Sequence, residues 1–192
     1  MTLSQTGRLS ARLLCRPHNK PLRRTVRDKV PGRIGQHAAA EPGRLRMNIR
    51  PAHADDAQAI ATVHVRSWQA AYRGVVPDAY LDSLSIEQRT TFWRGFLEEP
   101  SRPEIWAADA DPPIIGWAII SQSRDKDAAP RTGELNAIYV LPEYWSSGVG
   151  RALWIKAKER LSERGFDQVT VWVLADNVRA IRFYKLPVSL LD

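Results

Sequence analysis

The fold is decided by the stretch Glu134–Arg151, which reads ELNAIYVLPEYWSSGVGR. Its first seven residues have the character of a β-strand, and Pro142 ends them. Gly148 and Gly150 then stand at the start of a helix that we expect to run to about Arg164. Two glycines separated by one residue let a backbone approach a ligand closely, and the first N–H groups of a helix are free to bind an anion. The stretch therefore indicates a seat for a pyrophosphate, although glycine-rich helix starts without a ligand are at least as common.

Two better-known phosphate motifs fit this stretch less well. The Walker loop needs Lys followed by Ser or Thr after its glycines, and that pair is absent here. The dinucleotide-binding fingerprint belongs in an opening βαβ unit with an acidic residue further on, whereas this motif lies late in the chain. Neither fold explains the two glycines.

The rest of the chain alternates between helical and extended patterns. We expect strands at about residues 48–50, 104–108, 114–120, 134–140 and 169–173, and helices at about 56–72, 86–97, 148–164 and from 177 onward. The 192 residues are 44% apolar and include seven tryptophans, which is enough for one substantial core. One folded domain over residues 47–192 is therefore expected.

The net charge of +7 is concentrated at one end of the chain. Residues 1–46 contain 11 Lys and Arg against two acidic residues, whereas residues 47–192 contain 17 basic and 19 acidic residues. A basic body that could follow the phosphates of a nucleic acid is absent, so a nucleic-acid partner is not expected.

Residues 1–46 contain no Trp, Tyr or Phe, are rich in Arg, Pro and Gly, and show no sustained period. We predict that they form a disordered basic extension. Three accounts of this extension stay open, namely a natural basic tail, a transit-like presequence, and residues upstream of a start at Met47.

The only cysteine, Cys15, lies in the extension. An internal disulfide and a thiolate zinc cluster in the body are thereby excluded, and we expect no metal. An acyl group could not pass through a cysteine of the body, so its transfer would be direct or use a weaker nucleophile. No apolar run approaches the roughly 18 residues of a membrane span, and no signal-peptide core follows the basic start. We expect a soluble, cytoplasmic protein that does not bind membranes.

Three separated motifs resemble those of the GNAT-type N-acetyltransferases in order and spacing. They are the strand Glu134–Pro142, the loop that continues to Arg151, and the segment Asn177–Lys185, which reads NVRAIRFYK. The resemblance runs from about Met47 to Lys185. It implies an α/β (α+β) fold in which helices flank a mixed, mostly antiparallel central sheet.

The same resemblance implies that acetyl-CoA lies between the strand carrying Ile138 and Val140 and the strand that ends near Leu174. The amides of Ile138 and Val140 would pair with the pantetheine arm, and the loop after the strand would hold the pyrophosphate. An alternative for Arg151 is a solvated residue of the first helical turn. The cofactor-binding residues implied are Ile138, Tyr139, Val140, Ser146, Ser147, Gly148, Val149, Gly150, Arg151 and Asn177.

Acetyl transfer to an amine needs a base, because an alkyl ammonium with a pKa of about 10 is protonated at neutral pH. Glu134, at the start of the strand, is the predicted base and would act through water. Tyr184 stands where the family has a tyrosine near the sulfur of CoA, so it is the predicted acid. The alternatives are a surface carboxylate for Glu134 and an aromatic anchor for Tyr184.

Other residues of the body have weaker signals. His64 falls on an apolar helix face, where a core histidine is the favoured interpretation. Trp68 and Tyr72 fall where the family has its acceptor wall, but core packing would explain them equally well. Asp78 and Asp82 could attract a cationic acceptor, although a solvated face is the default.

The sequence departs from the family pattern in two places. Trp145 stands where the family has Gln or Arg, and Ser146 stands where it often has Gly. After Lys185 the family continues through a Gly-Phe turn into two more strands, whereas this chain continues as LPVSLLD. We therefore expect the last one or two strands to be lacking and the strand near Val169 to expose an apolar edge. Self-association, such as a homodimer, or low solubility would follow.

The predicted function is that of an acetyl-CoA-dependent N-acetyltransferase that moves the acetyl group directly to an amine of a small molecule or peptide. The alternative is a non-catalytic acetyl-CoA-binding or interaction module, because the shortened chain could lack part of the acceptor wall.

Overall fold

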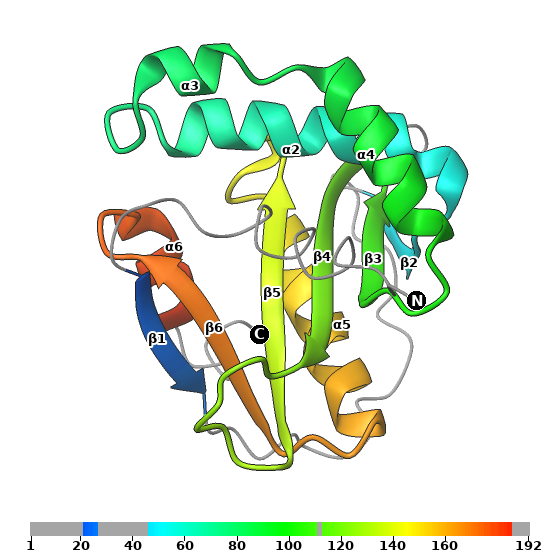
Figure 1. Cartoon of the computed structure of the whole chain (residues 1–192), viewed down its shortest axis with the longest axis vertical. Helices are drawn as coiled ribbons and strands as arrows, with labels where there is room; N and C mark the ends of the chain where they lie inside the picture. Colours follow the sequence, from blue (N-terminus) through cyan, green and yellow to red (C-terminus); the bar gives the residue numbers. More distant parts are fainter. Residues whose placement is uncertain (1–20, 27–45, 111–112, 186–192) are drawn as a thin grey trace, which may run out of the picture.

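The computed structural model describes residues 21–26, 46–110 and 113–185. These residues form one six-stranded sheet in the order β1-β6-β5-β4-β3-β2, with helices on both of its faces (Figure 1). The elements are β1 (Pro21–Val26), β2 (Asn48–Pro51), η1 (Ala54–Asp56), α2 (Ala57–Ala71), α3 (Asp78–Asp82), α4 (Ile86–Glu98), β3 (Glu104–Asp109), β4 (Ile114–Gln122), β5 (Thr132–Val140), η2 (Pro142–Tyr144), α5 (Val149–Glu163), β6 (Gln168–Leu174) and α6 (Val178–Lys185).

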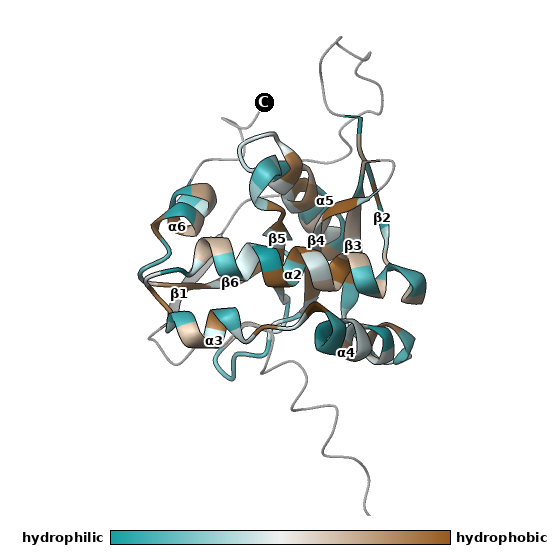
Figure 2. Cartoon of the chain, turned by 90° about the horizontal axis from the view of Figure 1, so that it is seen from above, coloured by the Kyte–Doolittle hydropathy of each residue, from teal (hydrophilic) through white to brown (hydrophobic). Residues whose placement is uncertain are grey.

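The sheet is mostly antiparallel, as the sequence predicted. Strands β2 to β5 pair antiparallel with one another, β5 and β6 pair parallel, and β1 pairs antiparallel with β6. The parallel pair is possible because α5 connects β5 to β6 as a crossover. Figure 2 shows hydrophobic residues on the central strands, between α5 on one side and α2 on the other.

Helix α5 lies close to one face of the sheet because two strand positions there are glycines. A Cβ atom at Gly133 would lie 2.7 Å from Leu161 Cδ2, and one at Gly116 would lie 3.2 Å from Leu153 Cδ1. The side chains of Leu153 and Leu161 therefore occupy the space that larger residues on the strands would fill.

The opposite face of the sheet carries an aromatic core around His64 of α2. The ring of His64 is 1% exposed and lies 5.6 to 5.9 Å from the rings of Trp68, Trp93, Trp117 and Tyr139. Trp93 Nε1 donates a hydrogen bond of 3.3 Å to His64 Nδ1. Burial lowers the pKa of His64 to about 3, so the imidazole is neutral at physiological pH. His64 is therefore a core residue, as its place on an apolar helix face suggested.

Besides the short 3-10 turns η1 and η2, the helix α3 and the strand β1 were not predicted. The prediction of a disordered extension is wrong for Pro21–Val26, which pair with β6 over six residues, from Pro21 opposite Leu174 to Val26 opposite Val169. No local pattern reveals this strand, because its hydrogen-bond partner lies almost a chain length away. The rest of residues 1–46, apart from Arg46, lies outside the described residues.

Strand β1 covers the edge of β6. The apolar edge that we expected to be exposed is paired with β1. The physical reason for expecting self-association is thereby removed, and a homodimer stays an untested prediction.

Within the described ranges, no helix is both long and apolar enough to cross a bilayer. The same residues contain no cluster of His, Cys, Asp and Glu that could hold a metal ion.

Candidate active site

The site is created where β5 and β6 separate. Their parallel pairing covers only Thr132–Leu135 of β5 and Gln168–Val171 of β6. Beyond this point Asn136–Val140 and Trp172–Leu174 line a cavity of about 810 Å³. The backbone of β5 on this side has no strand partner within the described chain, so it is available to an extended ligand, as the resemblance implied.

Eight of the ten predicted cofactor-binding residues line this cavity, namely Ile138, Tyr139, Val140, Ser146, Gly148, Gly150, Arg151 and Asn177. The other two do not. Val149 is fully buried in the core, and the Ser147 hydroxyl donates to the carbonyl oxygen of Tyr144 at 2.6 Å. The Ser147 hydroxyl is therefore bound within the loop itself.

The loop before α5 has an unusual backbone conformation. Gly148 is the N-terminal cap of α5 and has a φ of +91°, while Ser146 has a φ of +63°. A residue other than glycine is strained at the first of these angles. The loop therefore brings the first N–H groups of α5 to the cavity wall, which is the arrangement that favours anions.

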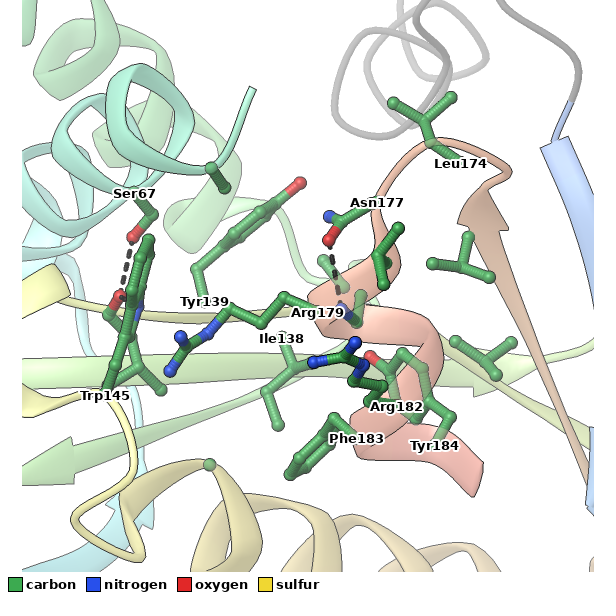
Figure 3. A pocket seen from close by; sticks show the side chains of 18 of the residues that line it. Ser67, Ile138, Tyr139, Trp145, Leu174, Asn177, Arg179, Arg182, Phe183 and Tyr184 are labelled. Carbon is green, nitrogen blue, oxygen red and sulfur yellow. Dashed lines mark hydrogen bonds between the residues drawn. The ribbon is translucent and has the colours of Figure 1, made fainter. Parts of the chain in front are cut away.

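The upper end of β5 is held by two side chains that converge on the carbonyl oxygen of Val140 (Figure 3). Ser67 Oγ of α2 lies 3.0 Å from this oxygen, and Trp145 Nε1 donates to it at 2.8 Å. Trp145, one of the departures from the family pattern, therefore has a structural function. Ser67 was not predicted, because only the fold brings α2 to the end of β5.

The charged side chains that line the cavity are all arginines. They are Arg151 of α5 and Arg179 and Arg182 of α6, and no Asp or Glu belongs to the described lining. Figure 3 shows Arg179 and Arg182 extending from α6 over the cavity. Three arginines on one cavity lining suit a polyanionic ligand. Arg179 and Arg182 were not predicted as binding residues, although both lie within the third motif.

Tyr184 lies on the same helix and lines the cavity. Its ring packs edge-to-face against Trp154 of α5, with 6.1 Å between the centroids, and against its neighbour Phe183. At the start of α6, Asn177 Oδ1 accepts a hydrogen bond of 3.0 Å from the backbone N–H of Ala180, the capping contact expected of this residue. Tyr184 therefore lines the cavity and also packs α6 against α5 through its ring.

Glu134, the predicted base, lies just below the point where the strands separate and is not part of the lining. It is 1% exposed. Arg124 Nη2 lies 2.5 Å from Oε1, while Arg124 Nε and its backbone N–H donate to Oε2 at 3.1 and 3.0 Å. Arg124 therefore occupies both carboxylate oxygens, and the structure does not bring Glu134 and Tyr184 together in one cavity.

Comparison with known proteins agrees with the fold. Residues 63–186 match the acetyltransferase (GNAT) family. The uncharacterized N-acetyltransferase YuaI of Bacillus subtilis is 34% identical over 72% of this chain and 78% of its own length. The crystal structure of the PaiA N-acetyltransferase from Thermoplasma acidophilum in complex with coenzyme A has a TM-score of 0.60 at 20% identity, over 72% of this chain and 86% of that one.

A more distant relative is named for its acceptor. The spermidine N(1)-acetyltransferase of Thermoplasma acidophilum is 23% identical over 73% of this chain and 86% of its own length. The yncA acetyltransferase of Salmonella typhimurium, solved with acetyl-CoA, has a TM-score of 0.51 at 19% identity, over 72% of this chain and 76% of that one.

The chain belongs to the GNAT family of acetyltransferases. It is an acetyl-CoA-dependent N-acetyltransferase, as the three motifs implied.

Proposed function

We propose that the protein transfers the acetyl group of acetyl-CoA directly to a primary amine. The amine nitrogen attacks the thioester carbonyl carbon, the carbon–sulfur bond breaks, and the sulfur leaves as the thiol of CoA after taking up a proton. The observation that carries this proposal is the cavity between the separated strands, with a glycine loop and three arginines on its lining. A thioester bound there would have its phosphates near the arginines and its pantetheine arm along β5.

Tyr184 is the proposed acid that protonates the leaving sulfur. Replacement by Phe removes the hydroxyl and keeps the ring contacts with Trp154 and Phe183. We expect Tyr184→Phe to lower kcat about 10- to 100-fold while the KM for acetyl-CoA changes little. Tyr144→Phe is the matched control, because Tyr144 also lines the cavity. An equal loss in both variants would argue against a special role for Tyr184.

Glu134 remains the proposed base, on the condition that Arg124 leaves its carboxylate. The Arg124 side chain is 42% exposed, so its guanidinium can move into solvent when the ion pair breaks. No described histidine or carboxylate lines the cavity in place of Glu134. A water at the apex of the separated strands would then relay the proton from the amine to Glu134.

This role can be tested by the pH dependence of the rate. If Glu134 is the base, Glu134→Gln lowers kcat and abolishes the acidic limb of the pH profile, whereas Arg124→Gln keeps that limb. If Glu134→Gln keeps the parent profile, Glu134 is a structural partner of Arg124, and the amine enters already neutral.

The acceptor, we propose, is an amine attached to an apolar or aromatic group, rather than a polyamine. Trp68 of α2 and Tyr72, which caps this helix, line the cavity with Tyr139, and the rings of Trp68 and Tyr72 lie 5.0 Å apart. These rings would recognise a flat, apolar body.

The acidic residues that could attract a polycation are already paired. Arg73 Nη2 lies 2.9 Å from Asp82 Oδ1, and Arg73 Nη1 lies 3.4 Å from Asp78 Oδ1. Neither Asp78 nor Asp82 belongs to the described cavity lining. The second and third charges of spermidine would therefore have no counter-charge there.

Release of CoA with a panel of amines tests both the function and the acceptor class. We expect kcat/KM for phenethylamine to exceed that for spermidine about tenfold or more, and Trp68→Leu to reduce this preference. Tyr80→Leu is the control, since Tyr80 is 43% exposed and outside the lining. A preference for spermidine would overturn the acceptor class but not the activity. Binding of acetyl-CoA without turnover of any amine would favour the non-catalytic module.

A cytoplasmic location stays a prediction from the sequence.

A further inference from the structure

Arg179 makes a contact across the cavity that the family pattern does not account for. Its guanidinium carbon lies 4.2 Å from the centroid of the Trp145 ring, and its Nη2 donates to Ser146 Oγ at 3.3 Å (Figure 3). Trp145 and Ser146 belong to the loop before α5, whereas Arg179 belongs to α6. The contact therefore joins the two elements that border the cavity at this end.

Arg179 stacks on a residue, Trp145, that differs from the family pattern. Trp145 stands where the family has Gln or Arg, so a polar or positive side chain is missing from the loop. The stacked guanidinium of Arg179 returns a positive charge to the same place from another helix. Arg179 is exposed and lines the cavity, so its remaining N–H groups can reach a ligand.

We propose that Arg179 binds a phosphate of acetyl-CoA and that the ring of Trp145 is the platform that orients it. A guanidinium stacked on an aromatic face keeps its planar edge of donors free for the bidentate recognition of phosphate. The glycine loop would bind the pyrophosphate through backbone N–H groups, and Arg179 adds a charged contact from α6. Arg179 is thus a specificity residue for the nucleotide part of the cofactor.

The test compares a donor that carries phosphates with one that does not. Arg179→Gln should weaken binding of acetyl-CoA about tenfold, as expected for one charged hydrogen bond, and change binding of acetyl-pantetheine less than twofold. Arg179→Lys keeps the charge without the planar fork, so its affinity for acetyl-CoA should lie between that of the unchanged protein and that of Arg179→Gln. Arg131→Gln is the charge-matched control, because Arg131 is 67% exposed and pairs with Asp167 away from the cavity.

A second measurement separates the platform from the charge. Trp145→Leu should weaken acetyl-CoA binding, and it should do so less when Arg179 is already Gln, because the ring then has no guanidinium to orient and only its hydrogen bond to Val140 O is lost. Equal losses for acetyl-CoA and acetyl-pantetheine in Arg179→Gln, or no loss for acetyl-CoA, would overturn the proposal. Failure of the unchanged protein to bind acetyl-CoA would overturn the proposed function as well.

An independent observation concerns strand β1. The half of β6 that lines the cavity, Trp172–Leu174, has lost its pairing with β5. Its remaining strand partner is β1, in which Arg23 is opposite Trp172 and Pro21 is opposite Leu174. A single strand without partners is not stable in water. One wall of the cavity therefore depends on a segment that precedes the body of the domain.

We infer that Pro21–Val26 are required for binding of acetyl-CoA because they hold this wall in place. Successive residues of a strand point their N–H groups to opposite sides, so one of Arg23 and Arg24 donates to β6. Of the variants Arg23→Pro and Arg24→Pro, made in the full chain, one therefore removes a hydrogen bond of this pairing. At least one of them should raise the Kd for acetyl-CoA about tenfold or more. Arg23→Ala and Arg24→Ala are the matched controls, because they remove the charge and keep the backbone N–H.

Hydrogen exchange distinguishes loss of the wall from loss of the fold. In the weakened variant the amides of Trp172–Leu174 should exchange faster, while those of β3 and β4 keep their protection. An unchanged Kd in both proline variants would overturn the inference. So would a raised Kd without faster exchange in β6, because β1 would then act in some other way.

Discussion

The two halves of strand β5 differ in what lies beside them. The lower half, Thr132–Leu135, pairs with β6, and Leu135 is fully buried there. The upper half, Asn136–Val140, has no paired strand on that side within the described chain, and its residues line the cavity. Ile138 is accordingly only partly buried. One strand therefore contributes to stability where it is paired and to ligand binding where it is not.

The candidate site residues are divided between the paired half and the open half of β5. Glu134 lies in the paired half, and its carboxylate is bound by Arg124. Tyr139 lies in the open half and lines the cavity, with its ring stacked on His64. The end of pairing between β5 and β6 thus decides which side chains are available to a ligand.

The largest effect is expected when the paired half is truncated. Leu135→Ala should lower the free energy of unfolding by about 3 kcal/mol, because it leaves a cavity in the core. Ile138→Ala should cost less than about 1 kcal/mol and should instead raise the Kd for acetyl-CoA. Chemical unfolding and a binding titration on both variants check this. Equal losses of stability would mean that the two halves are not distinct.

The second effect concerns the neutral histidine beneath the open half. The folded pKa of His64, about 3, lies below its ordinary value of 6.5, so the unfolded chain binds the proton more readily. The stabilising contribution is complete above pH 6.5 and is lost as the pH falls toward 3. Between pH 7 and pH 5 the free energy of unfolding should fall by about 2 kcal/mol.

His64→Leu identifies the source of this dependence. Unfolding curves measured from pH 7 to pH 5 should be flatter in the variant by about the same amount. If the parent and the variant lose stability in parallel, other groups carry the pH dependence.

A smaller effect is expected in the loop before α5. Gly148→Ala should lower the free energy of unfolding by about 1 kcal/mol, because alanine is strained at a φ of +91°. Gly150→Ala should leave stability unchanged, since its Cβ would lie at an ordinary 3.5 Å from Phe183. Both should weaken acetyl-CoA binding. A loss of stability at Gly150 equal to that at Gly148 would contradict this account of the loop.

The smallest effect is expected at Ser67. Its hydroxyl has one proton and lies near two carbonyl oxygens, Val63 O at 2.5 Å and Val140 O at 3.0 Å. Ser67→Ala should cost about 0.5 to 1 kcal/mol, because Trp145 still donates to Val140 O. Thr62→Ala removes only a bond within α2 and should leave acetyl-CoA binding unchanged. A change in binding as large as that of Gly148→Ala would show that Ser67 positions the open strand.

Local patterns predicted most of this fold. The strand Glu134–Val140, the glycine loop and α5 follow from short-range spacing, so their positions agree with the structure. The strand β1 could not be found in this way, because six residues rich in arginine form a strand only when β6 accepts them. The same limit applied to Glu134, whose partner Arg124 lies in a loop, and to Arg179, whose contact with Trp145 crosses the cavity.

The place of β1 in the sheet has a consequence for the order of folding. Strands β1 and β2 follow each other in sequence but lie at opposite edges of the sheet, with four strands between them. During synthesis β1 leaves the ribosome first, yet its partner β6 is among the last strands to appear. Contacts this distant in sequence form slowly. Among the described strands, the first to be made is therefore expected to complete the sheet last, and with it the cavity wall that β6 provides.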